Sequence, residues 1–339
     1  MKTVVLTRHG KPEAAFELRE AEKPRPRPGQ VLIRVEAFGL NFADVMARQG
    51  LYADAPPLPS VLGYDVVGRI DETGPGVTNL TAGQRVLALT RFGGYAEFVT
   101  TDARAVIPVS ESLHTGVATA LATQYSTAYY CAEETVTLHE GDKVLIHAAA
   151  GGVGTALVQM AKRKGCVIYG TASGSKLKYL EEQGVHFPVD YTSQDFSAVI
   201  GRMTGPDKLD VIFDSIGGMS VQKGFRLLNY GGRMVCFGAS DFVSAKGNPL
   251  KLLRFGIGFG LYSPISLLKR STSLICVNML HIADHRPDLL QRCLQGVHEL
   301  YKNGQINPVV GGEFKVADIA QAHTLLESRR STGKIVVRW

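Results

Sequence analysis

The chain has 339 residues, of which 45% are hydrophobic and 20% are charged, and its formal net charge is +6. This length favours two domains over a single hydrophobic core. The composition excludes a wholly disordered chain. The basic residues are scattered, so the positive charge permits the binding of an anion but does not predict a nucleic-acid groove. We therefore expect no nucleic-acid partner.

The five cysteines lie far apart and form no CxxC pair. This pattern is typical of a reducing compartment and predicts neither a disulfide framework nor a zinc cluster. Charge appears too early in the first residues for a signal peptide. The longest apolar stretch, residues 250–268, is interrupted by Lys251, Arg254 and Pro264, so we do not expect it to cross a bilayer. The expected location is cytoplasmic.

Short segments rich in β-branched residues dominate the first third of the chain, and turns with glycine or proline separate them. Such segments favour β-strands. The first ~120 residues are therefore predicted to form a compact, barrel-like β domain. The predicted strands cover residues 4–6, 31–35, 66–70, 86–89 and 95–99.

Strands and helices alternate from about residue 120 onward, which favours a parallel, doubly wound sheet. The fold class is therefore α/β. The predicted strands cover residues 143–147, 167–170, 211–214 and 233–237, and the predicted helices residues 155–164 and 175–182. The tail adds expected helices at 289–301 and 319–326 and a last strand at 334–337.

A glycine-rich segment, residues 148–154, follows a predicted strand and opens a predicted helix. A dinucleotide-binding turn needs this context. Gly151 would let the backbone approach a pyrophosphate, and Gly154 would let the helix pack closely on the strand. The first glycine of the usual G-x-G-x-x-G pattern is replaced by Ala149. An ordinary strand-to-helix turn is the alternative interpretation.

The end of the next predicted strand bears on the choice of nucleotide. An NAD site favours an acidic residue about 20 positions after the glycine loop, where it binds the ribose hydroxyls. Residues 170–176 contain no carboxylate but include Ser173 and Lys176. This favours NADPH over NADH. The alternative is that Lys176 only begins a surface helix.

Residues 39–52, GLNFADVMARQGLY, together with the alanine-glycine loop, resemble the medium-chain dehydrogenase/reductase superfamily. Within it the chain is most similar to the quinone oxidoreductases and to the synaptic-vesicle membrane protein homologues (the vesicle amine transport protein family). The resemblance covers essentially the whole chain. Supporting landmarks lie at residues 59–63, 82–86, 214–218 and 333–337.

The resemblance implies a split domain layout. A GroES-like β-barrel catalytic domain, residues 1–122, would be completed by residues 271–339, and a Rossmann NADPH-binding domain, residues 123–270, would lie between them. The substrate would then bind in the cleft between the domains, and a homodimer would form largely through the nucleotide domains.

The resemblance also assigns site residues. Asn41 and Tyr52 would line the nicotinamide and substrate pocket. The residues expected to bind the cofactor are Thr127, Ala150, Gly151, Gly152, Val153, Gly154, Ser173, Lys176, Tyr191, Ser215, Phe237, Gly238 and Ser240.

The metal-ligand positions of the zinc enzymes in this superfamily carry different chemistry here. Asn41 stands where those enzymes have a cysteine, the pair Tyr64-Asp65 replaces a histidine-glutamate pair, and a second cysteine is missing near Thr123. An amide, a phenol and a hydroxyl do not form a tetrahedral zinc site. We therefore predict no metal.

Without a metal, the acceptor must already be electrophilic, as quinones and conjugated carbonyls are. Asn41, Tyr52 and Tyr64 are the candidate hydrogen-bond donors.

One alternative is a 2-alkenal or enone reductase. Another is a low-turnover NADPH-binding protein acting at membranes or with partners, because the basic and apolar residues 248–270 could lie on an anionic membrane surface. We prefer a substrate-pocket or dimer-face role for that segment, since its glycines and Pro264 interrupt a long amphipathic helix.

Overall fold

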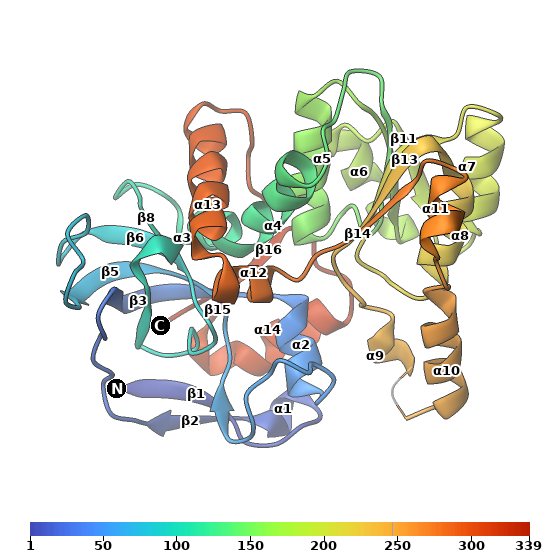
Figure 1. Cartoon of the computed structure of the whole chain (residues 1–339). Coiled ribbons are helices and arrows are strands. Elements are labelled where there is room, and N and C mark those ends of the chain that lie inside the picture. The colour runs from blue at the N-terminus through green and yellow to red at the C-terminus, as the bar shows by residue number, and fades with distance from the viewer. Residues whose placement is uncertain (246) are drawn as a thin grey trace. The chain divides into compact units, whose positions relative to one another are not determined.

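A computed structural model describes residues 1–245 and 247–339, and these residues form two compact units. The first unit contains residues 1–126 and 280–339, and the second contains residues 127–279. Figure 1 gives the labels of the helices and strands used below. No helix among the described residues is long and apolar enough to span a membrane.

Two sheets form the first unit. The smaller has the strand order β2-β1-β4, and the larger has the order β15-β16-β3-β5-β6-β8, with β7 paired to β3 beside this path. The pair β15–β16 is parallel, and the other pairs of the larger sheet are antiparallel. The bounds are β1 Lys2–Leu6, β2 Phe16–Glu20, β3 Gln30–Leu40, β4 Ser60–Val61, β5 Asp65–Thr73, β6 Arg85–Leu89, β7 Phe98–Asp102, β8 Val106–Pro108, β15 Val310–Lys315 and β16 Lys334–Arg338.

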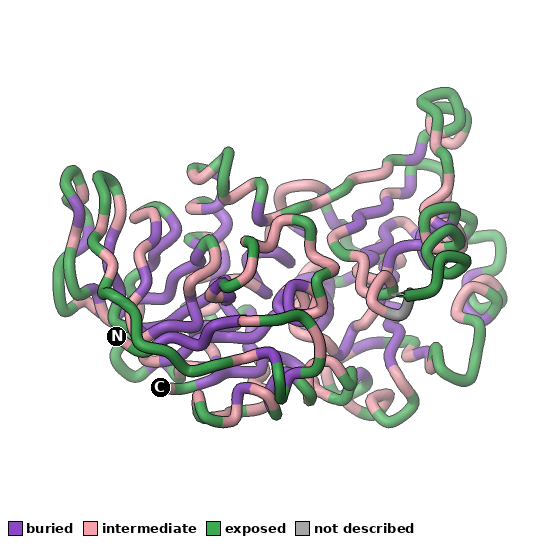
Figure 2. Tube along the Cα trace, turned by 90° about the horizontal axis from the view of Figure 1, so that it is seen from below, coloured by how far each residue is buried: buried purple, intermediate pink, exposed green. Residues whose placement is uncertain are grey.

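Strand β3 is the central strand of the larger sheet, because it pairs with β5 along most of its length, with β7 near its start and with β16 near its end. Its β-branched and aromatic residues fit this pleated, buried setting. Val31, Ile33, Phe38 and Leu40 belong to one apolar core that includes residues from both ends of the chain. In Figure 2 the strands are largely purple, that is, buried, and the connecting loops are largely green.

The predicted strand at residues 95–99 was wrong in its bounds, because the strand is β7, Phe98–Asp102. Tyr95 has other backbone partners. Its N–H donates to the carbonyl of Leu62, and its own carbonyl accepts from the N–H of Val4. Its ring is fully buried and stacks on Phe38, so the apolar pattern at this point reflects core packing and not a longer ladder.

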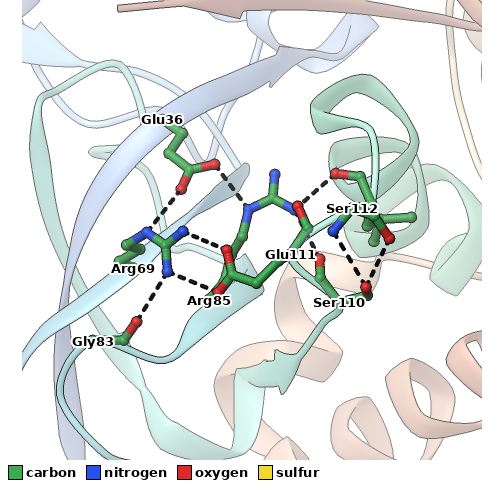
Figure 3. Close-up of polar contacts among 8 residues, drawn as sticks. Glu36, Arg69, Gly83, Arg85, Ser110, Glu111 and Ser112 are labelled. Carbon is green, nitrogen blue, oxygen red and sulfur yellow. Dashed lines mark hydrogen bonds and ion pairs between the residues drawn. The ribbon is translucent and has the colours of Figure 1, made fainter.

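An arginine cluster fastens the turn after β8 to the sheet of the first unit (Figure 3). Arg85 is buried and donates to the carbonyls of Ser110 and Leu113 at 2.9 and 2.7 Å. Glu36 accepts from Arg85 at 3.0 Å and lies 3.5 Å from Arg69. Charge-assisted hydrogen bonds of this kind are stronger than neutral ones and hold residues 110–113 against the sheet. Within the landmark at residues 82–86, Arg85 therefore has a structural role, because it holds the turn after β8 in place.

The second unit contains one parallel sheet, with the order β11-β10-β9-β12-β13-β14. The chain runs outward from β9 on one side and from β12 on the other, so the order reverses between these two strands. Ligands of open α/β sheets bind at the carboxyl ends of the strands at such a point. The bounds are β9 Lys143–Ile146, β10 Val167–Ala172, β11 Phe187–Asp190, β12 Leu209–Asp214, β13 Leu228–Cys236 and β14 Ser273–Cys276.

Helices cover both faces of this sheet, with α5 and α6 on one face and α7 and α8 on the other (Figure 1). The predicted doubly wound sheet is thus confirmed. The helix predicted at 155–164 begins earlier, at Gly152. The apolar pattern did not reveal this first turn because glycines contribute nothing to such a pattern. The helices of this unit are α4 Ser126–Tyr129, which begins one residue before it, η3 Tyr130–Glu134, α5 Gly152–Arg163, η4 Gly174–Lys176, α6 Leu177–Gln183, α7 Phe196–Thr204, α8 Met219–Leu227, α9 Phe242–Ala245, α10 Pro249–Gly258 and α11 Pro264–Leu268. Helix α12, Met279–His285, begins at the last residue of this unit and otherwise belongs to the first.

A continuous helical run, residues 115–134, carries the chain out of the first unit. The units divide after residues 126 and 279, whereas the predicted boundaries lie after residues 122 and 270. The helices of the first unit are α1 Pro12–Ala15, α2 Phe42–Arg48, η1 Ala103–Ala105, α3 Thr115–Ala120, η2 Leu121–Tyr125, α13 Pro287–Lys302, η5 Val316–Asp318 and α14 Ile319–Glu327.

Candidate functional site

The predicted cofactor residues of the second unit gather at the carboxyl ends of its parallel strands. Apart from Thr127, which lies in α4, each follows the end of a strand. Residues 150–154 follow β9, Ser173 and Lys176 follow β10, Tyr191 follows β11, Ser215 follows β12, and Phe237, Gly238 and Ser240 follow β13. One edge of the sheet thus collects residues from five loops.

The glycine loop turns sharply from β9 into α5. Ala148 adopts a left-handed conformation with φ 50°, and Gly151 precedes the first helical residue. A Cβ on Gly154 would lie 2.2 Å from the carbonyl oxygen of Ala148, so only glycine lets the helix approach the strand end this closely. No side chain caps α5. The N–H groups of its first turn can therefore bind an anion such as a pyrophosphate.

The loop after β10 contains both residues predicted to select the 2′-phosphate. Ser173 precedes η4, and Lys176 ends it. Lys176 is half-buried, and its burial lowers the pKa of the ammonium group. This loop also has an acidic neighbour that its own sequence does not reveal: Oδ2 of Asp190, from β11, would lie 2.7 Å from a Cβ on Gly174. Thr192 and Ser193 already donate hydrogen bonds to both of its carboxylate oxygens.

The loops after β12 and β13 support each other. Asp214 is fully buried and accepts from the N–H groups of Ile216 and Gly217 at 2.7 and 2.8 Å. A Cβ on Gly238 would lie 2.8 Å from the carbonyl oxygen of Ser215. The landmark at residues 214–218 therefore shapes the backbone of this edge of the sheet.

The first unit contains a second polar group, at the start of α2. Asn41 precedes this helix and is 9% exposed. The carboxylate of Asp44 accepts from the N–H of Asn41 at 2.8 Å and from the N–H of Gly63 at 3.2 Å. Burial raises the pKa of Asp44 to about 7, although the hydrogen bond from Asn41 opposes this shift. These bonds fix the backbone of Asn41 against the loop that leads to Tyr64.

The side chain of Asn41 has a partner at each end of its amide. Its Nδ2 donates to Oδ1 of Asp65 at 3.3 Å, and its Oδ1 accepts from Nζ of Lys334 at 3.0 Å. Lys334 also forms an ion pair with Asp65, and both side chains are 0% exposed. These three residues come from β3, β5 and β16, which are neighbours in one sheet.

The two predicted phenols lie beside this group. Tyr64 is 5% exposed, and its hydroxyl makes no hydrogen bond of ordinary geometry with a described residue. The rings of Tyr52 and Tyr64 meet edge-on with their centroids 6.4 Å apart, and Tyr52 is less buried than Tyr64. Burial raises the pKa of both phenols, so both are protonated near neutral pH and can donate.

In the first unit Asn41 thus contacts three residues that the sequence did not single out, Asp44, Asp65 and Lys334, and Tyr52 and Tyr64 are neighbours of each other. The signal for Lys334 was its place in the landmark at residues 333–337, but a lysine is ordinarily exposed even within a strand. Among the described residues, no group of three histidine, cysteine or acidic side chains could hold a metal ion.

Comparisons with known proteins agree with both units. The model of the alcohol dehydrogenase GroES-like domain matches residues 27–111, and that of the zinc-binding dehydrogenase matches residues 183–337. The synaptic vesicle membrane protein VAT-1 homolog of Rattus norvegicus is 33% identical over 340 aligned positions, covering 99% of this chain and 84% of the rat protein.

Solved structures show the same fold. Mycobacterial Rv1454c, solved as a complex with NADPH, is 27% identical with a TM-score of 0.85, and each chain is covered completely. A mycobacterial quinone oxidoreductase is 28% identical with a TM-score of 0.82, again over 100% of both chains. The CurK enoyl reductase is 25% identical with a TM-score of 0.85, covering 99% of this chain and 98% of the reductase.

A glycine loop on a parallel sheet, joined in one chain to a GroES-like unit, defines a two-domain oxidoreductase. The chain belongs to the medium-chain dehydrogenase/reductase superfamily, within which the VAT-1 homologues are its relatives at 33% identity.

Proposed function

We propose that this chain uses NADPH to reduce a quinone or a related conjugated carbonyl compound, without zinc. The observation that carries the proposal is the donor group around Asn41 and Tyr64, where metal ligands stand in the zinc enzymes. An amide and a buried phenol can donate hydrogen bonds to a carbonyl oxygen as negative charge develops on it. They offer no set of thiolate and imidazole ligands for zinc.

The second unit has residues that fit the cofactor. The first turn of α5 would bind the pyrophosphate, and Ser173 and Lys176 would bind the 2′-phosphate. Thr127, Tyr191, Ser215 and residues 237–240 are proposed to line the remainder. NADPH would supply the hydride when bound, and the neighbour Rv1454c was solved with this nucleotide.

The residues of the first unit would act on the acceptor. Asn41 and Tyr64 would orient the acceptor carbonyl and stabilise its charge, and Tyr52 would border the same pocket. A quinone spreads the developing charge over its ring, so it demands less of these donors than a simple ketone, which would concentrate the charge on one oxygen. Solvent can then deliver the final proton.

A steady-state screen with purified protein would test this function. Quinones, enals and enones would be offered with NADPH and with NADH, and a simple alcohol with NADP. We expect the quinones to be reduced fastest with NADPH. Faster oxidation of the alcohol than reduction of any conjugated acceptor would contradict the proposal. Preference for an enone would favour the alternative of an enoyl-type reductase, which the similarity to CurK supports.

Substitution of Lys176 by glutamate should weaken the binding of NADPH selectively. The new carboxylate would repel the 2′-phosphate and could accept bonds from the ribose hydroxyls of NADH. We expect the dissociation constant for NADPH, measured by quenching of intrinsic fluorescence, to rise roughly tenfold or more, and that for NADH to change little. Lys178→Glu, two residues further along, is a matched control. A wild-type protein that binds both nucleotides equally would refute the selection by Ser173 and Lys176.

Purified protein should contain no stoichiometric zinc. Asn41 is engaged with Asp65 and Lys334, and the buried ammonium group of Lys334 repels a second cation. Elemental analysis should therefore give far less than one zinc per chain, and chelator treatment should leave turnover unchanged. One tightly held zinc per chain, with activity lost on its removal, would show that the donor group had been misinterpreted.

The second unit is also proposed to form a homodimer. Strand β14 is the last in its sheet, and many large apolar side chains of α10, α11 and their link are exposed: Leu250, Leu253, Ile257, Leu261, Ile265 and Leu268. A patch of this kind usually marks a contact surface.

The proposed location is cytoplasmic, in keeping with five free cysteines.

Leu253→Asp combined with Ile257→Asp should therefore convert a dimer to a monomer in size-exclusion chromatography with light scattering. Leu18→Asp, on exposed strand β2 of the other unit, should leave the dimer intact. An anionic membrane is the alternative partner for this apolar patch, because residues 247–276 contain no acidic residue. A monomeric wild-type protein that binds vesicles of phosphatidylserine, but not of phosphatidylcholine, would favour the membrane.

A further inference from the structure

We propose that Lys334 is a positioning residue, which together with Asp65 clamps the side-chain amide of Asn41 in a single orientation. The clamp is a property of the folded first unit, and its kinetic consequence rests on the proposed function. It links three side chains that sequence separates widely: Asn41 and Lys334 are 293 positions apart, and Asn41 and Asp65 are 24 positions apart.

The charges of the two partners favour one orientation of the amide, and the capping box of α2, in which the Asn41 side chain also accepts from the backbone N–H of Asp44, agrees with it. The carbonyl oxygen of Asn41 faces the ammonium group of Lys334 at 3.0 Å, and its NH2 group faces the carboxylate of Asp65 at 3.3 Å. The reverse orientation would place the NH2 group against a cation and the oxygen against an anion. Both interactions lie in a buried environment, where electrostatic energies are larger than in water.

Strand β3 leaves room for the side chain of Lys334 because residue 39 is a glycine. A Cβ on Gly39 would lie 2.1 Å from Cε of Lys334 and 2.6 Å from Oδ1 of Asp65. Gly39 pairs with Val336 in the sheet, so the lysine side chain crosses β3 at the residue that has no side chain. A buried ammonium group without partners would be strongly destabilising, and here its partners are the carboxylate and the amide oxygen.

The Nδ2 group of Asn41 has two hydrogens, and among the described residues Asp65 accepts one of them, which leaves the second for a bound acceptor. The bond to Asp65 fixes the direction of the second hydrogen. The Asn41 amide is therefore presented as an oriented donor, whereas an unclamped amide could rotate and present its oxygen to the acceptor. Preorganised donors of this kind stabilise developing charge more than mobile ones.

A double-mutant cycle tests the clamp. Asn41→Ala should lower kcat for quinone reduction by about 100-fold, as expected for the loss of one oriented donor, and Lys334→Met should lower it by on the order of 30-fold. In the double variant the two losses should not multiply, so its kcat should equal that of Asn41→Ala. The dissociation constant for NADPH should stay within about twofold of wild type throughout, because the residues proposed to bind its phosphates lie in the other unit.

Two further variants keep the test informative if Lys334→Met folds poorly. Lys334→Met with Asp65→Asn removes both charges and leaves no unpaired carboxylate, and it should show the same loss of kcat. Arg48→Met with Glu327→Gln removes another ion pair of the first unit whose arginine is buried, without touching Asn41. Its effect on kcat should multiply with that of Asn41→Ala.

The side-chain amide of Asn41 supplies a readout that needs no turnover. Its 15N–1H signals, assigned with the Asn41→Ala variant, should exchange slowly with solvent in the wild type and become fast and free-amide-like in Lys334→Met. Unchanged amide signals, or losses of kcat that multiply to about 3,000-fold, would overturn the clamp. If the wild type reduces no acceptor, the proposed function fails and the amide signals still decide the clamp.

Discussion

Replacement of Gly154 by alanine should strongly weaken the binding of NADPH. The added methyl group would lie 2.2 Å from the carbonyl oxygen of Ala148 and 2.8 Å from Cα of Ala149, so α5 must move away from the strand end. This movement would displace the N–H groups proposed to bind the pyrophosphate. We expect the dissociation constant to rise at least about 100-fold, which corresponds to roughly 2.7 kcal/mol. Isothermal titration calorimetry would measure it.

Gly256→Ala is a matched control for this substitution. Gly256 is also a helical glycine of the second unit, but a Cβ there meets nothing within 4 Å. Alanine favours a helix over glycine by about 1 kcal/mol, so this variant should be slightly more stable and bind NADPH normally. Binding that survives Gly154→Ala with near wild-type affinity would show that the glycine loop is an ordinary turn, the alternative that the sequence left open.

Replacement of Tyr64 by phenylalanine should slow turnover while stabilising the fold. The hydroxyl of Tyr64 is buried and makes no hydrogen bond of ordinary geometry with a described residue, so its removal relieves a desolvated polar group and loses at most a weak interaction with Tyr52. If this hydroxyl is the donor to the acceptor carbonyl, kcat should fall by on the order of 10²-fold. The midpoint of thermal unfolding should rise slightly or stay constant.

Tyr52→Phe is the natural comparison, because Tyr52 is less buried and borders the same group. We expect a smaller decrease of kcat for Tyr52→Phe than for Tyr64→Phe. A Tyr64→Phe variant with full activity would assign the phenol to the wall of the pocket only. A variant that is both inactive and clearly destabilised would point to a structural hydrogen bond.

The elements that were predicted well are those whose signal is local. The buried strand β9, the glycine loop and α5 follow one another within 21 residues, and each has its own pattern of apolar or small side chains. Helix α13 was similarly clear from its apolar spacing. In contrast, β15 begins with Val310 and two glycines, a composition that disfavours strands, and it exists because β16 provides a parallel partner.

The same division applies to the site. The sequence by itself determined the glycine loop, the residues after the strand ends and the amide and phenol at the metal-ligand positions, because each depends on residue type and on short spacing. Only the tertiary structure decided that Lys334 is buried against Asp65 and Asn41. That contact requires β16 from the end of the chain to pair with β3 near its beginning, with Gly39 leaving room for the lysine. Pairing over such a separation leaves no periodic trace in the sequence, because it is set by the sheet as a whole and not by neighbours along the chain.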